Sequence, residues 1–170
     1  MSLAISTALG AVLLLIGWSD LRHRRIPNAL VGAIVALWLL GLPGSAHGAL
    51  AATLALALLV LLAGMLVWWF GWLGGGDVKL IAALSLWAGP THLAAFLLAT
   101  ALLGGVLGLA MLLTPWFARS AALAPIVAAL HVRLPDAIMT GSMSPTAPSL
   151  PYGLAIAAAG LLVVRPTVGI

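Results

Sequence analysis

The chain has 170 residues, of which 64% are hydrophobic and 6% are charged. A soluble globular surface needs about a quarter of its residues charged, so this composition excludes a soluble domain and makes the lipid bilayer the expected solvent. The net charge of +4 rests on few, scattered basic residues, which favours contact with membrane lipid headgroups and argues against a nucleic-acid partner. With no cysteine, the chain can form no disulfide, thiol nucleophile or cysteine-based zinc site.

Six apolar segments, each nearly free of charge, predict an all-α fold: a polytopic transmembrane helical bundle that forms one domain over residues 1–170. In chain order the segments are 3–18, 29–42, 49–72, 78–90, 92–114 and 150–164. Helices are expected because a helix satisfies its own backbone hydrogen bonds in lipid. The second and fourth segments are shorter than the ~20 residues that cross a hydrocarbon core, so we expect them to lie partly inside the bundle or to reach water early.

Residues 115–149 interrupt this pattern and are predicted to form a proline-rich cytoplasmic loop within the domain. The prolines in this stretch are Pro115, Pro125, Pro135, Pro145 and Pro148. The apolar piece 121–130 contains one of them and is too short to span, so we expect it to lie on the membrane surface or to re-enter the membrane.

The distribution of basic residues predicts the orientation. If the N-terminus faces outward, Arg22, Arg24, Arg25, Lys79, Arg119 and Arg133 fall on one side and only Arg165 falls on the other. The positive-inside rule then makes the richer side cytoplasmic, and we expect a multi-pass protein of the inner membrane. Tryptophans at the predicted span ends fit interfacial belts: Trp18, Trp68, Trp69, Trp72 and Trp116 toward the inner side, and Trp38 and Trp87 toward the outer side.

The chain has three acidic residues, Asp20, Asp77 and Asp136, and no glutamate. Asp20 follows the first predicted span and Asp77 follows the third, so both end at the same membrane face. A carboxylate at the edge of a bilayer is costly and by default marks a functional site. Asp136 lies in the proline-rich loop, where we expect it to be solvated.

Structural roles for the two edge carboxylates stay open at this point. Asp20 could extend to water and pair with Arg22, Arg24 or Arg25. Asp77 could be the N-cap of the helix that follows it, and this role is compatible with catalysis.

Three consecutive glycines, Gly74, Gly75 and Gly76, precede Asp77 and leave no side chain between the backbone and an approaching extended peptide. They are candidate substrate-binding residues, although a flexible turn between spans would have the same composition. Lys79 is included with them; it also fits a positive-inside anchor on a different face of the helix from Asp77.

Two carboxylates brought close together share one proton, because both cannot ionise cheaply. The ionised member can then activate water while the protonated member donates to the developing oxyanion, as an aspartic protease requires. We therefore expect Asp20 and Asp77 to be the catalytic pair. This chemistry needs no cofactor, and the four histidines have no metal-ligand spacing, so no metal site is predicted either.

These residues resemble those of the type IV prepilin leader peptidase family, which belongs to the GxGD membrane aspartic proteases. The resemblance is carried by Asp20 with Arg25-Ile26-Pro27-Asn28, by Gly74-Gly75-Gly76-Asp77-Val78-Lys79, and by Pro151-Tyr152-Gly153, and the span pattern extends it over nearly the whole chain. It implies an aspartic endopeptidase that removes the leader of a prepilin or pseudopilin precursor at the cytoplasmic membrane face, with Asp20 and Asp77 as its catalytic residues.

The same resemblance separates this chain from the larger members of the family. Those members carry a cysteine-rich cytoplasmic insert and also methylate the new N-terminus, whereas this chain has no cysteine and only residues 21–30 between Asp20 and the core of the second span. It is similar to the short, peptidase-only branch that is often paired with Flp or tight-adherence pili, so methyltransferase activity is not expected.

Two functions from other classes remain as alternatives. In a small proton-coupled transporter, Asp20 and Asp77 would carry protons or bind a cation, but such a path usually needs polar groups near the bilayer midplane. In a non-catalytic assembly factor of a pilus or secretion machine, the aspartates would be membrane anchors only.

Overall fold

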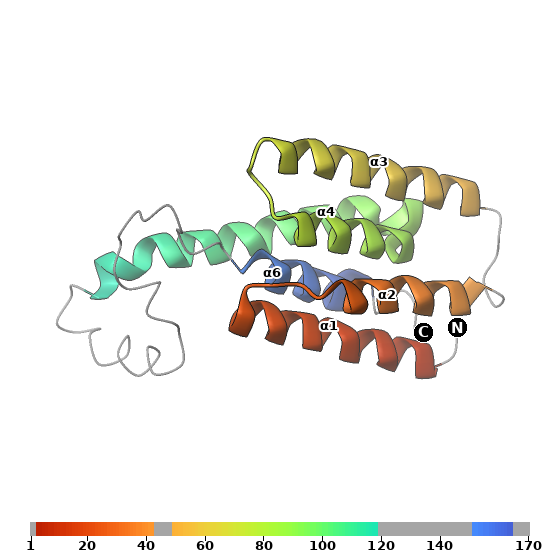
Figure 1. Cartoon of the computed structure of the whole chain (residues 1–170), viewed down its shortest axis with the longest axis horizontal. Coiled ribbons are helices and arrows are strands. Elements are labelled where there is room, and N and C mark those ends of the chain that lie inside the picture. Colours follow the sequence, from red (N-terminus) through yellow and green to blue (C-terminus); the bar gives the residue numbers. More distant parts are fainter. Residues whose placement is uncertain (1–2, 43–48, 119–150, 165–170) are drawn as a thin grey trace. The chain divides into compact units, whose positions relative to one another are not determined.

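The computed structural model describes residues 3–42, 49–118 and 151–164. Its elements are α1 (Leu3–His23), α2 (Asn28–Gly41), α3 (Leu50–Trp69), α4 (Gly75–Ala118) and α6 (Tyr152–Ala159), which continues as the π-helical segment η4 (Gly160–Val164) (Figure 1). Within these residues there is no strand, so the predicted all-α fold is confirmed there.

Each predicted apolar segment overlaps a helix, but among the described residues only three helices are long and apolar enough to cross a membrane: α1, α3 and residues 75–113 of α4. The helices α2 and Tyr152–Val163 are apolar but shorter. The predicted fourth and fifth spans are both parts of α4, which is interrupted at Gly89. The count of six crossings therefore stays a prediction.

Gly89 divides α4 into two helical segments because its backbone, at φ 57° and ψ −175°, is not helical. A residue with a side chain rarely adopts this positive φ. The 39 residues of α4 that could lie in a membrane would measure about 58 Å as one straight helix, nearly twice the ~30 Å of a hydrocarbon core. The interruption thus leaves two segments of more ordinary length.

At its other end α4 continues to Ala118, so the first four residues of the predicted loop 115–149 are helical. The rest of that loop, including 121–130 and Asp136, lies outside the described residues. The chain divides into two compact units, residues 1–104 with 151–170, and residues 105–150. Both edge carboxylates belong to the first unit, and the second contributes the end of α4 to the described structure.

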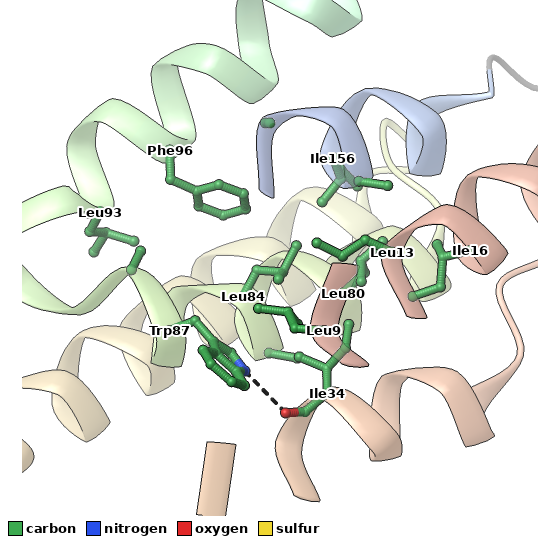
Figure 2. Packing of buried hydrophobic residues seen from close by; sticks show 14 residues of the cluster. Leu9, Leu13, Ile16, Ile34, Leu80, Leu84, Trp87, Leu93, Phe96 and Ile156 are labelled. Carbon is green, nitrogen blue, oxygen red and sulfur yellow. Dashed lines mark hydrogen bonds between the residues drawn. The ribbon is translucent and has the colours of Figure 1, made fainter. Parts of the chain in front are cut away.

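The hydrophobic core of the first unit is built by one face each of α1, α2, α4 and α6 (Figure 2). Its largest fully buried side chains are Leu9, Leu13, Ile16, Ile34, Leu80, Leu84, Phe96 and Ile156. Close contacts at glycines bring α6 against its neighbours: a Cβ on Gly17 would lie 3.1 Å from Leu154, and one on Gly160 would lie 3.2 Å from Leu13.

Trp87 corrects one prediction, because it does not belong to an outer interfacial belt. Its ring is 7% exposed, and its Nε1–H donates a hydrogen bond to the carbonyl oxygen of Ile34 at 3.0 Å (Figure 2). A buried indole needs such a partner for its N–H, and here the bond ties α4 to α2. Trp18, Trp68, Trp69 and Trp72 are at least half exposed, as interfacial residues would be.

Candidate active site

Asp20 is the last member of the buried face of α1. This face comprises Ser6, Leu9, Gly10, Leu13, Ile16, Gly17 and Asp20, which recur once per helical turn as one helix face requires. Because Asp20 continues this face, its side chain points into the bundle and is only 6% exposed. Asp20 therefore does not extend to water, but the interaction with Arg24 that this alternative included is present.

The Asp20 carboxylate lies at the N-terminus of α6. The backbone N–H of Leu154 donates to Oδ2 of Asp20 at 3.0 Å, and the N–H of Gly153 donates to the same carboxylate. Pro151, the N-cap residue of α6, makes no side-chain cap hydrogen bond. Asp20 thus supplies from α1 the cap that α6 lacks, at the end of a helix where a negative charge is favoured.

Gly153 is required by this arrangement. A Cβ at this position would lie 2.9 Å from Oδ2 of Asp20 and 2.8 Å from Cδ1 of Ile26. Real Cβ contacts are not this short, so a side chain at residue 153 would force the Asp20 carboxylate, the Ile26 side chain or both to shift. The Pro-Tyr-Gly sequence that opens the last predicted span therefore contributes directly to the surroundings of Asp20.

Asp77 lies in the first turn of α4 and is half-buried. The N–H of Val78 donates to the carbonyl of Gly74 at 3.1 Å, which makes Gly74 the N-cap and Asp77 the third residue of the helix. The Asp77 carboxylate accepts a hydrogen bond from the backbone N–H of Gly74. The predicted N-cap position is therefore wrong, but Asp77 does bond back to the N-cap N–H, as the acid of a capping box does.

The two carboxylates are close enough to interact electrostatically, and Asp77 also interacts with Tyr152, the first residue of α6. Asp77 precedes the buried residues Leu80, Leu84 and Trp87 at helical spacing, so it continues the inward face of α4 as Asp20 continues that of α1. Two acids from segments far apart in sequence therefore lie at the same end of the buried core and within electrostatic range of each other, Asp20 at the N-terminus of α6 and Asp77 in the first turn of α4.

Tyr152 was not singled out as a site residue from the sequence. Its ring lies directly against the backbone of Gly104 in α4, where a Cβ would overlap the ring atoms. Gly104 accommodates this aromatic side chain, while nothing lies within 4 Å of a Cβ built on Gly105. A lone tyrosine after a proline gave no periodic signal that could have predicted this contact.

Lys79 is exposed, and its Nζ donates to Oδ1 of Asn28, the first residue of α2, at 3.3 Å. The helix α2 has Pro27 at its N-cap position and no side-chain cap hydrogen bond. Lys79 and Asn28 thus join the N-terminal turns of α4 and α2. The substrate-binding role predicted for Lys79 stays a prediction.

Positive charge reaches the site from the end of α1. Arg24 interacts electrostatically with Asp20, and its own backbone, at φ 51°, ends the helix. Arg22 and Arg25 are exposed. Over the described ranges, no group of three or more His, Asp or Glu side chains comes together in a way that could hold a metal ion.

Comparisons with known proteins give one match. A sequence model of the type IV leader peptidase family matches residues 7–109, which is more than half of the chain and includes both Asp20 and Asp77. Searches of the curated proteins and of the solved structures found no match.

Proposed function

Since the chain belongs to the type IV leader peptidase family, we propose that it is an aspartic endopeptidase whose catalytic residues are Asp20 and Asp77. The observation that supports this proposal is that both carboxylates accept hydrogen bonds from backbone N–H groups at a helix N-terminus and lie within electrostatic range of each other. The proposed substrate is a prepilin or pseudopilin precursor of the Flp or tight-adherence type. Cleavage would occur at the cytoplasmic membrane face.

The surroundings of the two acids suggest how they divide the work. Asp20 accepts hydrogen bonds from two backbone N–H groups and lies near Arg24, whereas Asp77 accepts one from Gly74. Donors and positive charge favour the ionised form of a carboxyl group. We therefore assign the ionised role to Asp20 and the protonated role to Asp77.

In the proposed reaction, Asp20 takes a proton from water while the water oxygen attacks the carbonyl carbon of the scissile bond, and Asp77 donates its proton to the carbonyl oxygen. The tetrahedral intermediate then collapses: Asp77 recovers its proton, the C–N bond breaks, and the leaving amine takes the proton held by Asp20. The products are the leader peptide with a new carboxyl end and the pilin with a new N-terminal amine.

The proposal is tested by co-expression of the chain with a candidate pilin precursor and a mobility-shift assay of leader removal. We expect Asp20→Asn and Asp77→Asn each to lower cleavage by at least about 10³-fold, because an amide can neither accept nor supply the required proton. Both variants should accumulate in the membrane as the wild type does.

Asp136→Asn is the matched control, because it removes the only other acid of the chain. It should cleave like the wild type. Full processing by either the Asp20 or the Asp77 variant would rule out the catalytic pair.

No observation favours the transporter over the peptidase. The buried polar side chains among the described residues, apart from Asp20, are the hydroxyls of Ser6, Thr53, Ser85 and Thr100, and none of them is ionisable in the range that proton transport uses.

A further inference from the structure

The side chain of Ile26 lies between the start of α4, which carries Asp77, and the start of α6, where the Asp20 carboxylate is bound. A Cβ on Gly76, which precedes Asp77, would lie 3.3 Å from Cβ of Ile26, and its three nearest atoms all belong to Ile26. A Cβ on Gly153 would lie 2.8 Å from Cδ1 of Ile26 and 2.9 Å from Oδ2 of Asp20. One half-buried side chain therefore touches the backbone beside both carboxylates.

The segment that holds Ile26 is itself fixed at several points. The N–H of Arg24 donates to the carbonyl of Asp20 at 3.0 Å, and the hydroxyl of Ser19 donates to the carbonyl of Arg25 at 2.9 Å. Pro27 follows Ile26 and restricts it to an extended backbone. Ile26 also packs against the buried core, so neither its backbone nor its side chain is free to move aside.

We propose that Ile26 is a positioning residue that sets the separation of Asp20 and Asp77. Its Cβ, Cγ1 and Cδ1 hold the start of α4 at Gly76, and its Cδ1 also holds the start of α6 at Gly153, where Asp20 is bound. If the side chain is shortened, both helix ends can move inward and the two carboxylates lose their relative position. This inference rests on the proposed function for its catalytic consequence, but the geometric role can be measured without it.

The catalytic test compares kcat and KM of purified variants on a purified pilin precursor in detergent micelles. We expect Ile26→Ala to lower kcat by about 10- to 100-fold, as small misplacements of catalytic groups do, and to leave KM within about twofold. Ile26→Val loses only Cδ1, the atom nearest Gly153, whereas Ile26→Ala loses every side-chain atom beyond Cβ. The kcat of Ile26→Val should therefore fall between those of the wild type and Ile26→Ala.

Leu30→Ala is the matched control. Leu30 is a half-buried residue on the edge of the same core, and its truncation removes as much side-chain volume, but it is not among the atoms nearest Gly76 or Gly153. It should keep kcat near the wild-type value. An equal loss of kcat in Leu30→Ala, or a change confined to KM in Ile26→Ala, would overturn the positioning role.

A second measurement does not depend on cleavage. The cysteine-free chain allows spin labels at Leu21→Cys and Lys79→Cys, two exposed positions on the helices that carry the acids. We expect Ile26→Ala to shift or broaden the distance distribution between the labels, and Leu30→Ala to leave it unchanged. An unchanged distribution in Ile26→Ala refutes the inference even if cleavage occurs. Lack of cleavage by the wild type refutes the proposed function alone.

Discussion

The three glycines that precede Asp77 have different surroundings, although they are identical in sequence. A Cβ on Gly74 would lie 2.7 Å from Oδ2 of Asp77, whereas a Cβ on Gly75 would lie 3.4 Å from Nε1 of Trp68, an ordinary contact. Gly76 is intermediate, because its neighbour Ile26 would have to give by a few tenths of an ångström. The first glycine is therefore required for the position of the carboxylate, and the second is not.

This difference predicts the effect of two otherwise equal substitutions. Gly74→Ala should lower the rate of leader cleavage by about tenfold or more, because the new methyl group displaces the Asp77 carboxylate and alanine is a poor N-cap. Gly75→Ala should keep the rate within about twofold of wild type. The measurement is the initial rate on the same pilin precursor, with membrane levels matched, and equal losses in both variants would contradict the proposed geometry.

The inward direction of the two acids could have been predicted from spacing. Asp20 follows Leu13 and Ile16 at helical intervals, and Asp77 precedes Leu80 and Leu84 in the same way. The partners of the acids could not be predicted. Asp20 bonds to Leu154, which is 134 residues away in the chain, and no local pattern encodes which helix end will lie beside a given side chain.

The start of the short helix α6 is held by contacts with two neighbouring helices, α1 and α4. Asp20 of α1 accepts hydrogen bonds from the N–H groups of Gly153 and Leu154, and the Tyr152 ring packs against Gly104 of α4. A helix of eight residues has little stability of its own, so these contacts determine where α6 begins. They also bring Tyr152 within electrostatic range of Asp77.

The adjacent glycines Gly104 and Gly105 of α4 allow a test of the packing contact between the Tyr152 ring and Gly104. We expect Gly104→Ala to destabilise the protein by about 1–3 kcal/mol, because its methyl group overlaps the Tyr152 ring. Gly105→Ala should be neutral or slightly stabilising, since the space around it is open and alanine favours a helix. Thermal unfolding in detergent measures both, and a Gly104→Ala midpoint equal to that of Gly105→Ala would show that the ring does not rest on this position.

The outer surface of the described structure is apolar over long stretches. On α3 only Thr53 and Ala57 are buried, while Leu58, Leu62 and Leu66 are each more than half exposed. An exposed apolar surface of this size is not found on soluble monomeric proteins, and it fits a protein surrounded by lipid. This agrees with the three described helices that are long and apolar enough to cross a membrane. Most apolar residues of α3 are therefore available to lipid, while Leu56 and Val60 pack against the core.

Membrane orientation can be tested because the chain has no cysteine of its own. Leu3→Cys and Trp72→Cys introduce single thiols at exposed positions, 75% and 82% exposed, at the start of α1 and just before α4. With the proposed outward N-terminus, a membrane-impermeant maleimide should label residue 3 in intact spheroplasts and residue 72 only in inverted vesicles. The opposite labelling would place Asp20 and Asp77 on the outer side and exclude cleavage at the cytoplasmic face.

The sequence by itself determined the all-helical class, the apolar segments, and the two acids that follow them, because hydrophobicity, helical period and charge are properties of the local chain. The tertiary structure decided which parts meet: Asp20 with the start of α6, Ile26 with Gly76 and Gly153, Lys79 with Asn28, and Trp87 with the core. These contacts depend on how side chains fit between helices that are distant in the chain. A glycine that lets two helices approach, or one that interrupts a helix as Gly89 does, changes this fit without changing the periodic pattern of hydrophobic residues. The two acids were visible as candidates from their flanking residues, but only the packing of α1, α4 and α6 makes them neighbours.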